Sequence, residues 1–359
     1  MVERGGLAAV TTVTTPPAAA PASATGSAAG GRLRRRRRDI TRLVARRVAM
    51  TIPLLVLISA GVFLLAAYSP FNPLAAYLGS RYQSTSAAER ESLTAALGLD
   101  APWWQAWWQW MTAVAGGDLG WSRIYSQPVT TVFGERLPWT LLLSATGLVV
   151  AVATAVALGT AAGVRPGSWL DRACSALAVV IQAVPPFVVA IAGVAVFAVT
   201  LRWAPAAGAT DPGADYSVGQ VARHLALPAI ALAITQLPWM LLAVRSAVAE
   251  AAGSAAVRGA RARGVAPAVI VSKHIVPMSV TPLVTLIGAR LPELIVGAVL
   301  IEEVFAWPGL AATVVESAKA LDFSLLAALT VATTAVVFAG SLLADVLYLL
   351  IDPRITADV

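Results

Sequence analysis

Six apolar stretches dominate this sequence and limit what it can fold into. Each is long enough to supply the ~20 apolar residues that a helix needs to cross a lipid bilayer. Apolar residues make up 58% of the 359 residues and charged residues only 13%, well below the share in soluble domains. The sequence therefore predicts an all-α membrane protein with six transmembrane helices. We place the stretches near residues 48–68, 139–163, 173–200, 225–248, 278–300 and 325–350.

Charge is distributed unevenly over the segments between these stretches. Counted with the N-terminus in the cytoplasm, the inside segments carry 18 Arg or Lys and 6 Asp or Glu. The outside segments carry 7 basic and 11 acidic residues. Because the cytoplasmic loops of membrane proteins are enriched in Arg and Lys, we expect both termini to be cytoplasmic.

The first 39 residues differ in composition from the rest of the chain. Residues 1–31 are rich in Ala, Pro, Thr, Ser and Gly, a mixture that buries too little apolar surface to offset chain entropy. We interpret 1–39 as a disordered basic cytoplasmic tail that orients the first helix and attracts anionic lipids. We favour this over nucleic-acid binding, because the basic run lies beside a membrane span. The run comprises Arg34, Arg35, Arg36, Arg37 and Arg38.

The segment 69–138, which follows a first transmembrane helix at 40–68, is long enough to have structure of its own. In it, Trp103, Trp107 and Trp110 share one face of a predicted helix. This face favours a helix in the membrane interface, where indole rings sit well. A platform that binds substrate is the alternative. We expect an extracytoplasmic insertion between the first two transmembrane helices.

Few residues could carry out chemistry. Cys174, His224 and His274 have no partner at the spacing of a metal or catalytic site, and we interpret them as structural. Neither lysine sits in a Gly-x-x-x-x-Gly-Lys-Ser/Thr loop that could bind phosphate. We therefore expect no enzyme activity, metal or cofactor in this chain, and any ATP and Mg²⁺ belong to partner subunits. A membrane enzyme is the least favoured function class.

Polar residues inside the apolar stretches are candidates for a substrate pathway, because charges in lipid are costly and usually face a bundle interior or a wet cavity. Arg290 and Glu293 lie at i, i+3 spacing in the fifth stretch and can pair on one face of a helix. They either line a pathway or form a self-neutralised pair that packs helices together. Gln182 and Gln236 are further candidates in the third and fourth stretches.

Three motifs resemble segments of one known family. The first is Gly-Asp-Leu-Gly-Trp-Ser at 117–122, with Pro-Val at 128–129 and Arg-Leu-Pro-Trp-Thr-Leu at 136–141. Another is Glu-Glu-Val-Phe-Ala-Trp-Pro-Gly-Leu at 302–310, and the last is the C-terminal run 345–355. All are similar to segments of the binding-protein-dependent ABC permeases of the dipeptide/oligopeptide/nickel family.

A fourth motif, between the others, lies in the longest cytoplasmic loop at 250–277. It resembles the EAA loop of ABC importers, with Gly264 and Pro277 at the family's separation of 13 residues. Arg258 stands where the motif name has Glu, as is common in the peptide branch. Gly259 replaces the first Ala of the motif.

This resemblance implies a coupling helix that inserts into a cleft of an ATPase subunit. Residues 250–263 are rich in good helix formers, and Gly264 can end a helix with a left-handed turn. Arginines here can pair with carboxylates on the partner. The alternative is ordinary positive-inside arginine that faces lipid headgroups. The assigned coupling residues are Arg258, Gly259, Ala260, Arg261, Arg263, Gly264 and Pro277.

The resemblance covers roughly residues 40–355 and implies a type I ABC importer permease fold, with its core at 139–350 and a short tail at 351–359. It also implies partners: a second homologous permease, two cytosolic ATPase subunits and an extracytoplasmic substrate-binding protein. The location would be the bacterial plasma (inner) membrane.

The expected substrate is short peptides, moved by alternating access, whereas nickel, a metal chelate or another small solute would use the same architecture. An ion-coupled secondary transporter would need an internal repeat and discontinuous helices, and neither is clear in the sequence. A membrane sensor or scaffold that uses the basic tail is a further alternative, and it predicts that deletion of 1–39 abolishes function.

Overall fold

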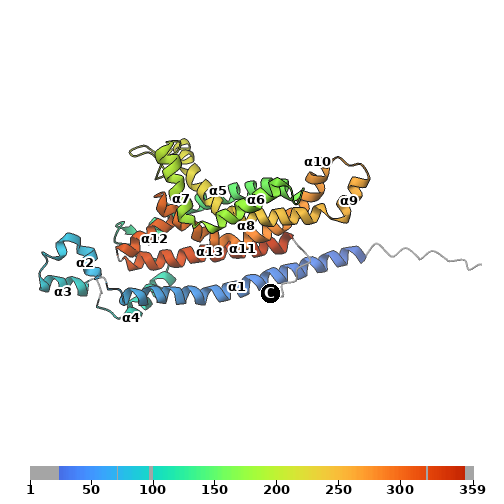
Figure 1. Ribbon diagram of the computed structural model, residues 1–359. Helices are drawn as coiled ribbons and strands as arrows, with labels where there is room; N and C mark the ends of the chain where they lie inside the picture. The colour runs from blue at the N-terminus through green and yellow to red at the C-terminus, as the bar shows by residue number, and fades with distance from the viewer. Residues whose placement is uncertain (1–23, 71, 97–99, 321, 352–359) are drawn as a thin grey trace, which may run out of the picture.

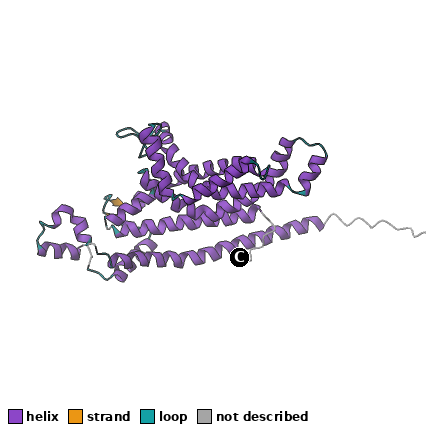
Figure 2. Ribbon diagram, in the orientation of Figure 1, coloured by secondary structure: helices purple, strands orange, loops and turns teal. Residues whose placement is uncertain are grey.

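A computed structural model describes residues 24–70, 72–96, 100–320 and 322–351. It is almost entirely helical (Figure 2). Its long helices run side by side along one direction, with short helices at both ends (Figure 1). We name the ends after two of these short helices. The α9 end carries α9 (Ala255–Ala262), and the α12 end carries α12 (Leu310–Lys319).

Four described helices are long and apolar enough to cross a membrane, or five spans if one bent pair counts as a span. This confirms an all-α, multi-pass membrane protein. The predicted stretch 278–300 lies in α11 (Val276–Val304), many of whose side chains are outside the described set. The count of six spans therefore stays a prediction. The four helices are α1 (Ala24–Ala67), α5 (Val129–Gly163), α8 (Val218–Ala252) and α13 (Phe323–Ile351).

The third predicted stretch, 173–200, is not one straight helix. It consists of α6 (Trp169–Ala183) followed by α7 (Pro186–Gly193) and the π-helical turn η2 (Val194–Thr200), bent by 99°. The bend lies at Pro185 and Pro186, because the residue before a proline is driven out of the helical region. Val184 and Pro185 are indeed extended, with ψ of 124° and 142°.

The N-terminal tail differs from the prediction in the part that the structure describes. Residues 24–39 belong to α1 rather than to a disordered tail, and residues 1–23 lie outside the described set. Ala and Arg are good helix formers, so the helix of the first span extends backwards through the basic run. Arg38 is exposed, whereas the side chains of Arg34–Arg37 are not described. Further along α1, Arg47 pairs with Asp345 of α13 at 2.5 Å.

Close packing of α5 against α8 forms the centre of the bundle. Glycines of α5 face α8, and a Cβ atom added to Gly163 would lie 2.6 Å from the Arg245 carbonyl oxygen. An added Cβ at Gly159 or Gly147 would lie 2.9 Å or 2.8 Å from side-chain atoms of α8. Small residues let two membrane helices approach this closely, so their dispersion contacts hold the core together.

The segment between the first two spans folds into short elements, but it ends earlier than predicted. The helix α5 begins at Val129, so 129–138 belongs to the second span's helix rather than to the insertion. The short elements are α2 (Pro73–Leu78), the 3₁₀ helix η1 (Gly79–Tyr82), α3 (Ala87–Ala96), α4 (Trp103–Ala115), and a hairpin of β1 (Trp121–Ser122) and β2 (Gln127–Pro128).

The predicted tryptophan face of α4 packs against α1. Trp107 donates its indole N–H to Ser59 Oγ at 3.0 Å, and the Trp110 ring lies 5.7 Å from the Phe63 ring. Trp103 joins the same core cluster. Trp104 and Trp108, on the other face, are exposed. The tryptophan face therefore packs α4 against α1 and is not free to bind substrate.

At the α12 end, the two buried carboxylates Asp322 and Glu302 connect segments that lie far apart in the sequence. Asp322 Oδ2 accepts hydrogen bonds from Ser122 Oγ at 3.0 Å and from the Arg123 N–H at 2.6 Å. Glu302 is fully buried, where it accepts from Thr140 Oγ1 at 2.6 Å and from the Ala311 N–H at 2.8 Å. The contact with Ala311 places this carboxyl group at the N-terminus of α12, where the helix dipole favours negative charge.

A tyrosine links the hairpin to α12. Tyr125 donates its hydroxyl to the Glu316 carboxylate of α12. Burial of the ring, followed by the adjacent Glu316 carboxylate, raises the pKa of Tyr125 above its usual value of 10.0. The phenol therefore stays protonated and keeps its role as a donor at neutral pH.

We expect Asp322→Asn to destabilise the protein by roughly 2 kcal/mol, because the backbone N–H groups of Arg123 and Leu325 lose an ionised acceptor. Thermal melting of the purified protein in detergent measures the effect. Asp215→Asn is the matched control, since Asp215 is exposed, and it should melt with the wild type. Equal melting of both variants would contradict a structural role for Asp322.

Candidate functional site

The loop after α8 forms a compact projection at the α9 end (Figure 1). We expected one helix over 250–263, but residues 250–252 belong to α8 and the chain breaks at Gly253 and Ser254. Ser254 Oγ accepts a hydrogen bond from the Val257 N–H at 3.3 Å and so caps α9. Serine is a preferred residue at that position, which explains why the helix restarts there.

The end of α9 follows the prediction for Gly264. Its φ is +74°, in the left-handed region that favours glycine, and its N–H donates to the Arg261 carbonyl at 3.0 Å. The chain then returns through α10 (Pro267–Ile270) and the π-helical turn η3 (Val271–Ile275) to α11. Pro277 lies in the first turn of α11, where a proline is tolerated.

The two faces of α9 have different surroundings. Val257 and Ala260 are fully buried and belong to the core cluster that includes Val248 of α8 and Ile275 of η3. The arginines Arg258, Arg261 and Arg263 are exposed, and Gly259 is partly buried. One face of α9 is therefore part of the core and contacts α8 and η3, whereas the other face is exposed.

One arginine of the three also has a local contact. Arg258 donates to the Gly253 carbonyl at the end of α8 and so helps to fix the angle between α8 and α9. Within the described residues, Arg261 and Arg263 make no ion pair. They are therefore available to carboxylates on another protein.

We expect Gly264→Val to make local unfolding of α9 easier. A β-branched residue at positive φ is strained by roughly 1–2 kcal/mol. Hydrogen exchange over 255–270 should become faster. Gly264→Asn is the matched control, since Asn tolerates the left-handed region, and its exchange should stay near that of the wild type. No difference between the two variants would show that the turn does not hold α9.

The base of the loop is fixed by an ion pair that sequence reasoning missed. Arg245 of α8 donates Nε and Nη2 to the two oxygens of Asp171 at 2.6 and 2.7 Å, and the Gly167 N–H donates to Asp171 Oδ2 at 2.8 Å. Both charged residues lie at the edges of predicted stretches, where we counted them as ordinary loop charges. Two parallel hydrogen bonds give this pair a fixed geometry, which joins α6 to α8.

The structure does not bring the predicted pathway residues together as one described site. Gln182 is exposed at the end of α6. Gln236 of α8 is buried, and a Cβ atom added to Gly297 of α11 would lie 3.4 Å from its amide nitrogen. Gln236 therefore packs between α8 and α11. Arg290 and Glu293 lie in α11, but their side chains are outside the described set. The pathway assignment stays a prediction.

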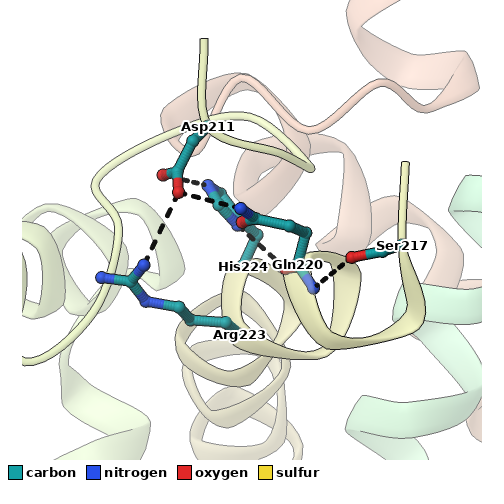
Figure 3. Close-up of polar contacts among 5 residues, drawn as sticks. All are labelled: Asp211, Ser217, Gln220, Arg223 and His224. Carbon is teal, nitrogen blue, oxygen red and sulfur yellow. Dashed lines mark hydrogen bonds and ion pairs between the residues drawn. The ribbon is translucent and has the colours of Figure 1, made fainter. Parts of the chain in front are cut away.

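At the α12 end, Asp211 connects the loop before α8 to its first turns (Figure 3). Its Oδ2 accepts from the Gln220 side-chain amide at 3.1 Å and lies 3.6 Å from Arg223 Nη1. Its Oδ1 lies 3.5 Å from Nε2 of the buried His224. No group of three or more metal-binding side chains occurs in the described part of the chain. We interpret His224 as a structural partner of Asp211.

Comparison with known proteins identifies the family. The family described as "Binding-protein-dependent transport system inner membrane component" matches residues 155–357, which is more than half of the chain, and its companion N-terminal family matches 40–144. The chain belongs to this family. The division between the two matches falls within α5.

Relatives extend this family membership over most of the chain. A putative peptide permease protein of Brucella suis biovar 1 is 34% identical over 310 residues, covering 86% of this chain and 97% of the relative. The oligopeptide transport system permease protein AppB of Bacillus subtilis is 30% identical over 313 residues, covering 87% and 98%. This protein is thus an ABC importer permease, and the resemblance seen in its motifs is confirmed.

Proposed function

We propose that this permease moves short peptides into the bacterial cytoplasm by alternating access. The observation that carries the proposal is α9, which has one face buried in the core and exposed arginines on the other. Support for peptides as the substrate comes from the names of relatives, a peptide permease and an oligopeptide permease.

The partners follow from this proposal. Two cytosolic ATPase subunits, which hold ATP and Mg²⁺, would receive the α9 loops of this chain and of a second, homologous permease. An extracytoplasmic binding protein would deliver the peptide at the α12 end. The excess of basic residues in the inside segments supports a cytoplasmic α9 end and cytoplasmic termini.

In the cycle, ATP-driven closure of the two ATPases would move the α9 loops together. The loop would pass this movement to α8 and α11 through Val257, Ala260 and Ile275, which share one core cluster. The Asp171–Arg245 pair would carry α6 with α8. The pathway would then open outward, and hydrolysis would reset it.

Uptake of labelled di- to pentapeptides into proteoliposomes tests this function. The vesicles hold the complete complex, its binding protein outside and ATP inside. We expect ATP-dependent uptake of peptide, with unlabelled peptide but not nickel competing. Uptake of nickel or a chelate in place of peptide would contradict the substrate, and uptake without ATP would contradict an ATP-driven importer.

A further inference from the structure

A cleft of about 680 Å³ lies at the α9 end, between α5, the start of α6 and the chain that returns from α9. Much of its wall is apolar. Val156 and Ala161 contribute from α5, and Val271 and Val276 from the return. Its size lies within the roughly 300–1,000 Å³ of pockets that hold small ligands. The arginine face of α9 does not line this cleft, so the proposed coupling role leaves it unexplained.

One side of the cleft is polar and basic. Arg165 lines it from the α5–α6 turn, together with the hydroxyl groups of Thr160 and Ser168. Arg165 is exposed and makes no ion pair within the described residues. Two more exposed basic residues lie close by along the chain, Arg172 in the first turns of α6 and Lys273 two residues after Val271.

None of the residues that line the cleft is acidic, and the nearby Asp171 carboxylate is already paired. The Asp171 carboxylate is held by Arg245 at 2.6 and 2.7 Å and by the Gly167 N–H at 2.8 Å. It is also buried, with 2% of its surface exposed. The rim of the cleft therefore presents positive charge at Arg165, which complements an anion.

Next to this charge lies a side chain that is typical of a membrane surface. Trp169 lines the cleft and is 79% exposed. Indole rings prefer the level of the lipid headgroups. Further along α6, Val179 and Val180 are exposed apolar residues, as expected where a helix faces lipid. An apolar groove that ends at a basic rim and an interfacial tryptophan matches an acyl chain with an anionic headgroup.

We propose that the cleft binds one anionic phospholipid, with its phosphate at Arg165 and an acyl chain between α5 and the returning chain. The proposal rests on the orientation in the proposed function, which places the α9 end at the cytoplasmic surface. Val271 belongs to η3 and Val276 to the first turn of α11. A bound lipid therefore stabilises η3 and the first turn of α11, which connect α9 to the bundle. The anionic lipid content of the membrane then changes how strongly ATP hydrolysis is coupled to transport.

Native mass spectrometry of the intact complex tests the site. The complex is purified in detergent and given equal amounts of phosphatidylglycerol and phosphatidylethanolamine of the same acyl chains. We expect the wild type to retain one phosphatidylglycerol in preference to phosphatidylethanolamine. Arg165→Gln should lower this preference roughly fivefold, the effect of one basic residue near an anionic headgroup. Ala161→Trp, which fills the groove and keeps the charge, should remove the lipid.

Arg42→Gln is the matched control. Arg42 is an exposed arginine of α1 on the same side of the membrane but outside the cleft, so its variant should retain the lipid like the wild type. Retention of phosphatidylglycerol by both cleft variants, or equal loss in the control, would overturn the proposal. So would a wild type that holds no lipid, together with an Ala161→Cys variant that forms a crosslink to a partner subunit.

This measurement needs neither peptide nor ATP. If the cleft proved not to bind lipid, the proposal of peptide uptake would still stand. A failure of peptide uptake would leave the retained lipid unchanged. The two proposals can therefore fail separately.

Discussion

Gly163→Ala should destabilise the permease, although an alanine within a helix is normally more stable than a glycine by roughly 0.5–1 kcal/mol. The new Cβ would lie 2.6 Å from the Arg245 carbonyl oxygen and 2.7 Å from Val248 Cβ, closer than atoms can approach. Overpacking of a core typically costs about 1–3 kcal/mol, and here one of the opposing atoms belongs to the backbone and cannot rotate away. We therefore expect an effect at the upper end of that range.

Gly134→Ala is the control within the same helix. Gly134 of α5 has nothing within 4 Å of an added Cβ, so alanine should leave the melting temperature unchanged or raise it. Thermal melting in detergent, together with the amount of folded protein in the membrane, compares the two variants. If Gly163→Ala melts at or above the wild-type temperature, the close approach of α5 and α8 is wrong.

Arg261→Glu should uncouple the permease from its ATPase subunits. Arg261 lies on the exposed face in the last turn of α9. If it pairs with a partner carboxylate as we propose, reversal of its charge turns that attraction into a repulsion of several kcal/mol. We expect at least a tenfold loss of ATPase co-purification and of peptide uptake. The fold should be unaffected, because the Arg261 side chain makes no ion pair within the described residues.

Arg42→Glu reverses a charge at the same end of the bundle but on α1, away from α9. It should keep the ATPase and support uptake. Pull-down of the ATPase through a tag on the permease, followed by quantification of both subunits, gives the ratio directly. Equal ratios for the two variants would mean that Arg261 does not face the ATPase.

The features that the sequence predicted correctly depend on local signals. Gly264 ends α9 with a positive φ because few other residues adopt that conformation, and Trp103, Trp107 and Trp110 share a face because a helix repeats every 3.6 residues. The break at Pro185 and Pro186 has a local signal too, but its 99° angle does not, since packing around the bend determines it.

The features that the sequence did not predict involve partners far apart in the chain. Asp322 binds Ser122 across 200 residues, and Arg245 binds Asp171 across 74. Ser122 lies in a recognised motif, and the other three residues entered only the count of loop charges. No periodicity or spacing in a sequence indicates which residues pair over such long separations. The role of Glu302 shows the same limit. Its motif resembles the family's, yet only the fold shows that its carboxylate lies against Gly309 and the N-terminus of α12.

Photocrosslinking from α9 tests the central claim, that this short helix is the contact with the ATPase. A benzophenone is attached to a cysteine at Ala262, an exposed residue of α9, in a Cys174→Ala background that has no other thiol. A cysteine at Ala207, exposed near the α12 end, is the control. We predict an adduct with the ATPase subunit from position 262 and none from 207. An intact, active complex that forms no adduct from 262, or forms one from 207, would contradict the account.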